Sequence, residues 1–287
     1  MIEPRMDRDK LASPSRGRRV ARKTVAVLPT LFTLGNVLCG FAAIFAASRV
    51  DDPSLPFGWT PLTFAVVFIF GGMLMDALDG RIARLTHSAS ELGEQLDSMA
   101  DMVTFGVAPA FLAVQLVEVG TPFFAAGDTL FGRLALVVAL IYVACVALRL
   151  ARFNIELDTD EEQDDDHTSF KGLPSPGAAG TVASLVLLHQ HLLARHPEPH
   201  WSLDAAAFIM VGVMLLVALA MVSQFRYVHV MNRYIRGQAP FGTLVKAVVC
   251  GLLLVVMPQW SLAAGFTAYA ISSPLGAAWR WANAWRS

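Results

Sequence analysis

The stretch WTPLTFAVVFIFGGMLMDALDG, residues 59–80, indicates the fold class of this chain, because it is apolar for most of its length and ends near two aspartates. A helix needs about 20 predominantly apolar residues to cross a bilayer, and this run is long enough. Across the whole chain 55% of the residues are hydrophobic and 16% are charged, whereas about 25% are charged in an ordinary soluble domain. The stretch therefore predicts a membrane-spanning helix.

Seven further apolar runs have the same character: 25–47, 92–118, 130–150, 174–194, 204–223, 241–257 and 259–276. We therefore predict an all-α fold, a polytopic transmembrane helical bundle of about eight spans. The last two runs are short and nearly contiguous at Pro258, so a single re-entrant helical hairpin is the alternative for that pair. The other segments predict a basic, irregular arm over residues 1–23, a single transmembrane domain over residues 24–287, and a solvated acidic loop over residues 155–169.

The distribution of Lys and Arg predicts how the chain is oriented, because cytoplasmic loops carry an excess of these residues. With eight spans, only Arg49, Arg133 and Arg195 of the 22 Lys and Arg residues fall on one side of the membrane. We therefore expect both termini in the cytoplasm and the basic arm close to anionic lipid head groups. The net charge of −1 gives no reason to expect a nucleic-acid partner.

Four aspartates lie at the predicted cytoplasmic ends of the second and third runs. Asp76 and Asp79 are three positions apart, and Asp97 and Asp101 are four apart, so each pair lies on one face of its helix. The short connection makes these two helices antiparallel neighbours, and we expect all four carboxylates to converge. Buried carboxylates repel one another unless cations neutralise them, and their hard oxygen atoms select ions such as Mg²⁺, Mn²⁺ or Ca²⁺. The spacing predicts a site for two divalent cations, which typically clamps phosphate oxygens.

Two alternatives compete with this metal site. The aspartates could cap helix ends or pair with nearby arginines, or they could form the ion path of a divalent-cation transporter. The segment between the two pairs contains small and basic residues: Gly80, Ala83, Arg84 and Gly93. Small residues let a ligand approach the backbone, and a guanidinium binds a diphosphate through two parallel hydrogen bonds. These residues, and the lack of an internal repeat, favour a nucleotide-diphosphate site.

The pattern Asp76-x2-Asp79-Gly80-x2-Ala83-Arg84-x8-Gly93-x3-Asp97-x3-Asp101 resembles the signature of the CDP-alcohol phosphotransferase family at every fixed position. The resemblance implies that the four aspartates hold two divalent cations, Mg²⁺ or Mn²⁺. It also implies that the four small and basic residues between the pairs line the site of the cytidine diphosphate moiety. Asp101 is the expected base for the acceptor hydroxyl, and Asp97 is the alternative, because coupled carboxylates share protons.

Three further segments, 29–40, 149–154 and 170–176, resemble the integral-membrane phosphatidylserine synthases within that family. This resemblance implies a catalytic domain with a six-helix core plus two spans, and a homodimer in the cell (inner) membrane. It implies CDP-diacylglycerol and L-serine as substrates, with the active site facing the cytoplasm. Another acceptor, such as glycerol 3-phosphate, inositol phosphate or choline, is the alternative within the family.

Two more sets of polar residues are candidate substrate ligands: Thr33 and Asn36 in the first run, and Arg149, Arg152, Asn154 and Lys171 after the fourth. The first set either forms interhelical hydrogen bonds or contacts the cytidine or phosphates. The basic residues of the second set either flank the membrane in the ordinary way or bind a phosphate or an amino-acid carboxylate. Ser175 has no nearby histidine to activate it and lies between two prolines, so we assign it to a turn.

Overall fold

Helices make up nearly all of the described part of the chain in this computed structural model, which describes residues 16–50, 58–86, 91–120, 129–160, 169–195, 201–228 and 241–284. In chain order the α-helices are α1 (Arg16–Ala47), α2 (Pro61–Thr86), α3 (Glu91–Asp101), α4 (Ala108–Gly120), α5 (Leu130–Asp160), α6 (Ser175–Arg195), α7 (Trp201–Val222), α9 (Phe241–Val256) and α10 (Pro258–Ala284). A π-helical turn, η2 (Met102–Val107), joins α3 to α4.

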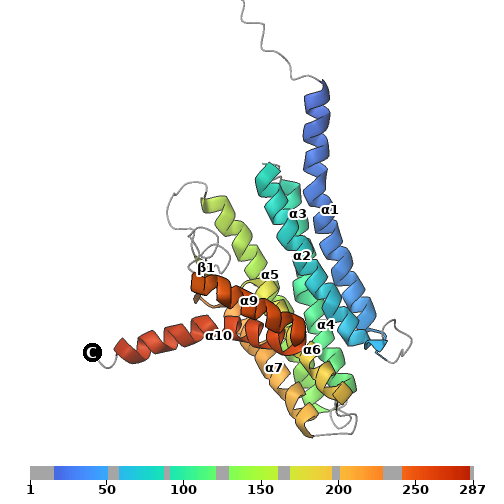
Figure 1. Cartoon of the computed structure of the whole chain (residues 1–287), viewed down its shortest axis with the longest axis vertical. Helices are drawn as coiled ribbons and strands as arrows, with labels where there is room; N and C mark the ends of the chain where they lie inside the picture. Colours follow the sequence, from blue (N-terminus) through green and yellow to red (C-terminus); the bar gives the residue numbers. More distant parts are fainter. Residues whose placement is uncertain are drawn as a thin grey trace, which may run out of the picture.

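Six segments of the described chain are long and apolar enough to cross a membrane, and they coincide with the first six predicted runs. The prediction of a multi-pass helical membrane protein is confirmed at this level. Helix α9 has 16 residues, which is about 24 Å of helix against a hydrocarbon core of about 30 Å. Figure 1 shows α9 and α10 running across the bundle, and Met257 is the single residue between the two helices. The eight-span count therefore stays a prediction.

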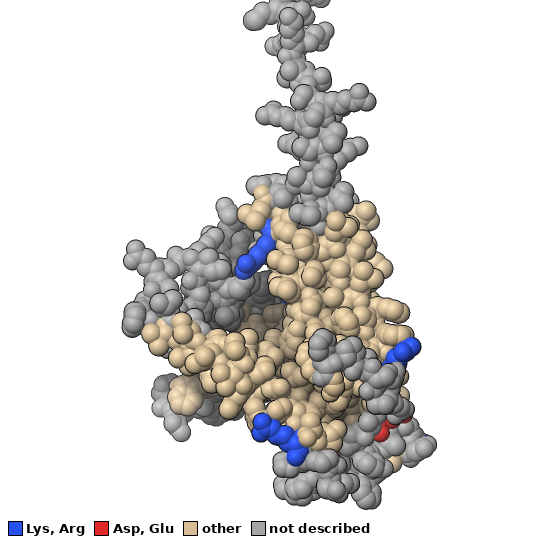
Figure 2. Space-filling model, turned by 45° about the vertical axis from the view of Figure 1, so that its right-hand side comes forward, with Lys and Arg blue, Asp and Glu red and all other residues tan. Residues whose placement is uncertain are grey.

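The outer surface of the bundle is apolar. Leu38 of α1 is 67% exposed and Leu216 of α7 is 66% exposed. On the face in Figure 2, the described charged side chains lie in the upper and lower parts of the molecule, and the area between them is uncharged. In water such a surface would drive association, whereas in a bilayer it is the surface that lipid covers.

Local sequence signals begin two of the spanning helices. Thr60 Oγ1 accepts a hydrogen bond from the Thr63 backbone N–H at 3.2 Å, and Pro61 takes the first helical position of α2, where a missing N–H is tolerated. At the start of α5, Thr129 Oγ1 accepts a hydrogen bond from the backbone N–H of Gly132, also at 3.2 Å. Both helices therefore begin at an N-cap that the sequence encodes directly.

Two helices extend beyond the predicted boundaries. Helix α1 begins at Arg16, inside the segment that we expected to be an irregular arm, and residues 1–15 of that arm lie outside the described residues. Helix α5 continues to Asp160, into the segment that we expected to be an acidic loop. The expectation of a loop from residue 155 is wrong for its first six residues, because a helix that leaves the bilayer can continue when water replaces lipid around its polar side chains.

The π-helical turn has a local cause in Pro109, the second residue of α4. Pro109 has no N–H to donate to the carbonyl of Phe105, four residues earlier, and its ring would crowd that carbonyl in a regular α-helix. The hydroxyl of Tyr142, which is fully buried on α5, donates to the Phe105 carbonyl oxygen at 2.9 Å instead. A membrane span must satisfy such a group internally, so Tyr142 replaces the missing backbone donor.

A short two-stranded antiparallel sheet was not expected from the sequence. Strand β1 (Ser169–Lys171) precedes α6, and strand β2 (Arg226–Val228) follows α7, with Phe170 opposite Tyr227. Tyr227 is 1% exposed, and its hydroxyl donates to the Ala270 carbonyl oxygen of α10 at 2.9 Å. The sheet therefore connects the start of α6 to α7 and α10.

Helix α10 packs closely on α6 through two glycines. A Cβ atom placed on Gly177 would lie 3.0 Å from Cε1 of Tyr269, and one placed on Gly180 would overlap the Phe266 ring. The Thr181 hydroxyl donates to the Gly177 carbonyl oxygen at 2.8 Å and also lies 3.3 Å from the Phe266 carbonyl oxygen of α10. These contacts fix α10 against the six-helix bundle, because close packing of small residues is a main source of helix association in membranes.

Candidate metal centre and substrate site

Three of the four predicted aspartates form a tight carboxylate group. Asp76 on α2 and Asp97 and Asp101 on α3 each offer one oxygen atom, and these atoms lie within 4.8 Å of one another. Oxygen ligands on opposite sides of one ion are separated by about twice the metal–oxygen distance, which is about 4.2 Å for Mg²⁺ and about 5 Å for Ca²⁺. The donor chemistry and the spacing of these three carboxylates therefore fit a divalent cation.

The fourth aspartate, Asp79, lies beside this group rather than in it. Its side chain is 4% exposed, and its Oδ2 accepts a hydrogen bond from Thr33 Oγ1 at 3.1 Å. Asp79 lies three residues after Asp76 on the same face of α2, so its carboxylate borders the group of three. All four aspartates thus belong to one polar cluster inside an otherwise apolar bundle.

Helix α1 forms a wall of this cluster, as the candidate residues Thr33 and Asn36 in the first run had indicated. We expected α2 and α3 to be the neighbouring pair, but α3 packs mainly against α1, and α1 also packs along α2. Thr33 donates to Asp79, and Asn36 Nδ2 donates to Asp101 Oδ1 at 3.1 Å. Of the two interpretations left open for Thr33 and Asn36, interhelical hydrogen bonding is therefore observed, and both bonds end on an aspartate.

The start of α6 provides a partner for Arg149 of α5. Arg149 Nη1 donates to Ser175 Oγ at 3.0 Å, and Ser175 is 1% exposed. Ser175 is the first residue of α6, so its assignment to a turn is wrong. Sequence reasoning missed this contact, because Arg149 and Ser175 belong to different helices and nothing local links them.

Arg152, one turn after Arg149, lies against the backbone of Gly172. Gly172 has φ +86°, and a Cβ atom at this position would lie 2.9 Å from Arg152 Nη2. The left-handed conformation and the close approach both favour glycine. The chain between β1 and α6 is thus shaped to admit a guanidinium next to the start of α6.

Asn154 connects α5 to the helix that carries Asp97 and Asp101. Its Nδ2 donates to Ser98 Oγ at 3.1 Å, and Ser98 Oγ is 3.2 Å from Asn154 Oδ1. Ser98 directly follows Asp97, so Asn154 lies next to the segment of α3 that carries the carboxylate group. Ser98 itself was missed, because it meets Asn154 only where two helices come together.

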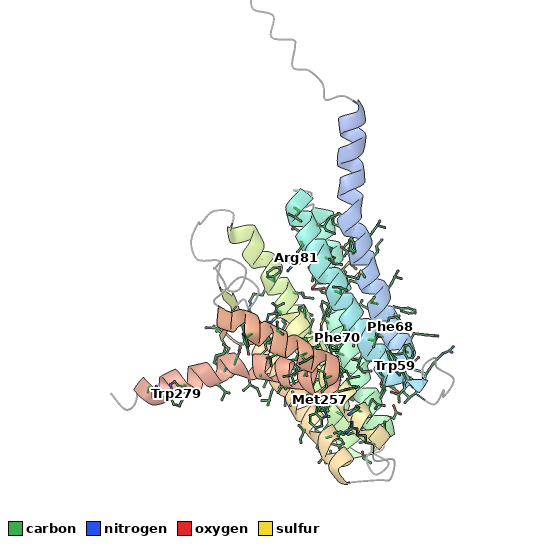
Figure 3. All side chains as sticks on the ribbon, viewed as in Figure 1. Trp59, Phe68, Phe70, Arg81, Met257 and Trp279 are labelled. Atoms are coloured by element: carbon green, nitrogen blue, oxygen red, sulfur yellow. The ribbon has the colours of Figure 1, made fainter. Side chains whose placement is uncertain are left out.

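The other signature residues lie on the same two helices. Gly80 follows Asp79, and Gly93 lies one turn before Asp97. The side chains of Ala83 and Arg84 are outside the described part, as is that of Lys171, whose backbone pairs with Arg226 in the small sheet. Figure 3 shows the neighbouring Arg81 toward the upper end of α2, away from Trp59, which precedes the same helix at its other end.

Comparison with known proteins matches this chain to one family. The CDP-alcohol phosphatidyltransferase family matches residues 26–220. A protein of Helicobacter pylori strain J99 named CDP-diacylglycerol–serine O-phosphatidyltransferase is 34% identical over 203 residues, which are 70% of this chain and 71% of that protein. Proteins of the same name from Bacillus subtilis strain 168 (34% over 166 residues, 58% of this chain and 78% of that protein) and Methanocaldococcus jannaschii (31% over 172 residues, 60% and 66%) are also similar.

Proposed function

The chain belongs to the CDP-alcohol phosphatidyltransferase family and is a transferase, and we propose that it moves the phosphatidyl group of CDP-diacylglycerol to the hydroxyl of L-serine. The relatives named for this reaction support the choice of both substrates. The observation that carries the proposal is the group of three carboxylate oxygens within 4.8 Å of one another, set in an otherwise apolar helical bundle.

In the proposed reaction the serine hydroxyl oxygen attacks the β-phosphorus of CDP-diacylglycerol. The bond from this phosphorus to the bridging oxygen breaks, and CMP leaves with that oxygen. The hydroxyl proton passes to a carboxylate, which we assign to Asp101, with Asp97 as the alternative. Asn36 donates to Asp101 Oδ1 and so orients this carboxylate. Little other covalent chemistry is required, because phosphoryl transfer depends mainly on positioning and charge stabilisation.

The proposed metal site uses Asp76, Asp79, Asp97 and Asp101 to hold two divalent cations, Mg²⁺ or Mn²⁺. Bound cations of this kind grip a diphosphate and offset the charge that develops on the leaving group. The position of Asp79, one turn after Asp76 on α2, supports a second cation. Around the metal site, the cytidine diphosphate would contact six residues of α1, α2 and α3: Thr33, Asn36, Gly80, Ala83, Arg84 and Gly93.

The acceptor serine is proposed to bind where α5 meets the start of α6. Arg149 and Arg152 provide guanidinium groups for its carboxylate, and Asn154 and Lys171 lie on the same side of the bundle. The contact of Arg149 with Ser175 supports this role, because it places a cation at a helix N-terminus, where anions are favoured.

We also propose the orientation predicted from the basic residues. Both termini and the aspartate cluster lie on the cytoplasmic side of the inner membrane, residues 24–287 form one catalytic domain after the arm 1–23, and α9 and α10 are the seventh and eighth spans of each subunit of a homodimer. A cysteine introduced at Met257 would react with a membrane-impermeant maleimide from the periplasmic side if α9 spans the membrane. A re-entrant hairpin would leave it unlabelled.

The experiment that tests the function uses the purified protein with CDP-diacylglycerol, Mg²⁺ or Mn²⁺, and one acceptor at a time. We expect CMP release and phosphatidylserine formation with L-serine, and neither in the presence of excess EDTA. Product formation with glycerol 3-phosphate, inositol phosphate or choline, but not with serine, would contradict the proposed acceptor. Flux of divalent cations through proteoliposomes without nucleotide, and no CMP release with any acceptor, would favour a transporter instead.

A further inference from the structure

We propose that Thr104, in the π-helical turn after Asp101, is a positioning residue for the metal centre. This proposal rests on the proposed function only in taking Asp101 as a metal ligand. Thr104 is fully buried and lies three residues after Asp101 along the chain. It acts on Asp101 through a residue of another helix.

The connecting residue is Asn36 of α1, which η2 and the end of α3 hold at two points. Thr104 Oγ1 donates to the Asn36 carbonyl oxygen at 2.9 Å, and Asn36 Nδ2 donates to Asp101 Oδ1 at 3.1 Å. The first bond fixes the backbone of Asn36, and the second uses its side chain to fix one oxygen of Asp101. Asn36 is 0% exposed, so no water competes for either bond.

Two glycines make room for Thr104 between α1 and α2. A Cβ atom on Gly40 of α1 would lie 2.9 Å from the Thr104 Cα atom. A Cβ atom on Gly72 of α2 would lie 2.5 Å from Thr104 Cγ2 and 2.8 Å from Asn36 Oδ1. The side chain of Thr104 therefore fills a space that three helical segments leave open, and it can move little without displacing Asn36.

The π-helical turn explains why the single hydroxyl of Thr104 can influence the position of Asp101. In the turn, the backbone N–H of Ala108 bonds to the Val103 carbonyl oxygen, five residues earlier. The added residue turns the end of α3 relative to α4, and π-helical turns are frequent at functional sites. The hydrogen bond of Thr104 holds α1 against this junction. Through Asn36, α1 in turn holds Asp101, which lies near Asp76 of α2.

The test compares Mn²⁺ binding to purified, detergent-solubilised variants by electron paramagnetic resonance, which needs no substrate. Thr104→Val keeps the shape of the side chain and removes the hydroxyl. We expect it to weaken Mn²⁺ binding about 10-fold, the lower end of the range for residues that orient metal ligands, and we expect Thr104→Ser to restore it to within about threefold. The metal concentration for half-maximal CMP release should rise by the same factor, with a smaller change in KM for serine.

The matched control is Thr181→Val on α6. Thr181 is also fully buried, and its hydroxyl also donates to a backbone carbonyl oxygen, that of Gly177, at 2.8 Å. This variant should lower thermal stability as Thr104→Val does but leave Mn²⁺ binding unchanged. If Thr104→Val does not accumulate in folded form, Thr104→Ala, which is smaller, gives the same comparison.

Folded Thr104→Val or Thr104→Ala with wild-type Mn²⁺ affinity would overturn the proposal and leave Thr104 with a purely structural role. Equal weakening by the Thr104 and Thr181 variants would overturn it as well, since the effect would then be one of general stability. Because Mn²⁺ binding is measured directly, these outcomes differ from a failure of the proposed reaction, in which the wild-type protein would bind Mn²⁺ and release no CMP with serine.

Discussion

Replacing Asp97 with asparagine removes one negative charge from the carboxylate group and leaves the side-chain shape nearly unchanged. The three oxygens lie within 4.8 Å of one another. Two unit charges at that distance repel by about 3.5 kcal/mol at an effective dielectric constant of about 20. The group holds three such pairs, and Asp97→Asn removes two of them, about 7 kcal/mol. This repulsion energy is an upper bound, because water and the protein chain rearrange around the charges and weaken their interaction.

The substitution should therefore have opposite effects with and without metal. In excess EDTA the variant should be more stable than the wild type, and a gain of only about 2 kcal/mol would raise Tm by roughly 4–8 °C for a domain of this size. In Mg²⁺ or Mn²⁺ the wild type should gain stability and the variant much less. We expect kcat/KM to fall at least 100-fold, which is about 2.7 kcal/mol in the activation barrier.

The assay is thermal unfolding in detergent with either EDTA or MgCl₂, together with CMP release. Glu118→Gln is the control, because Glu118 is exposed, lies on α4 and is outside the group of three. It should leave kcat/KM within about twofold and show no reversal of stability. A variant that is less stable than the wild type in EDTA, or that keeps its activity at ordinary Mg²⁺ concentration, would refute the charge-cluster reasoning.

Three further variants, and one control, test the packing, the π-helical turn and the acceptor site. Gly180→Ala should lower stability by about 1–3 kcal/mol, because its Cβ overlaps an aromatic ring of α10. Gly212→Ala is the control, because its added Cβ atom has no neighbouring atom within 4 Å. It should be neutral or slightly stabilising in the same thermal melt. Tyr142→Phe leaves the buried Phe105 carbonyl without its donor and should cost about 1–3 kcal/mol, measured as a lower Tm. Arg149→Met should raise KM for serine about 10-fold or more with a smaller change in kcat, as loss of a charged hydrogen bond predicts; an unchanged KM would remove Arg149 from the acceptor site.

The site residues divide according to whether their roles depend on local sequence. The four aspartates could be found from spacing, because positions three or four apart share a helix face wherever the helix packs. The family resemblance read from the same positions is confirmed. Ser98 and Ser175 gave no comparable signal, since each meets its partner, Asn154 or Arg149, only after α5 has packed beside α3 and α6.

The helical boundaries follow the same division. The starts of α2 and α5 are set by Thr60 and Thr129, whose capping bonds reach only three residues along the chain. The π-helical turn has a readable signal in Pro109, but its stability also requires the Tyr142 hydroxyl from a helix more than 30 residues later. The small sheet depends on pairing between segments on either side of α6 and α7, which periodicity within one segment does not reveal.

The amino-acid sequence alone determined that this is a membrane protein surrounded by lipid. It also determined the positions of the first six spanning helices and the helix faces that carry the aspartates. These features depend on composition and on the 3.6-residue helical repeat, which act over one or two turns. Only the tertiary structure decided that α3 packs mainly against α1, that Thr104 reaches Asn36 and that α10 covers the glycines of α6. Such contacts join residues 68 and 85 positions apart, and they depend on how each helix is rotated and how closely it packs, which no local pattern specifies.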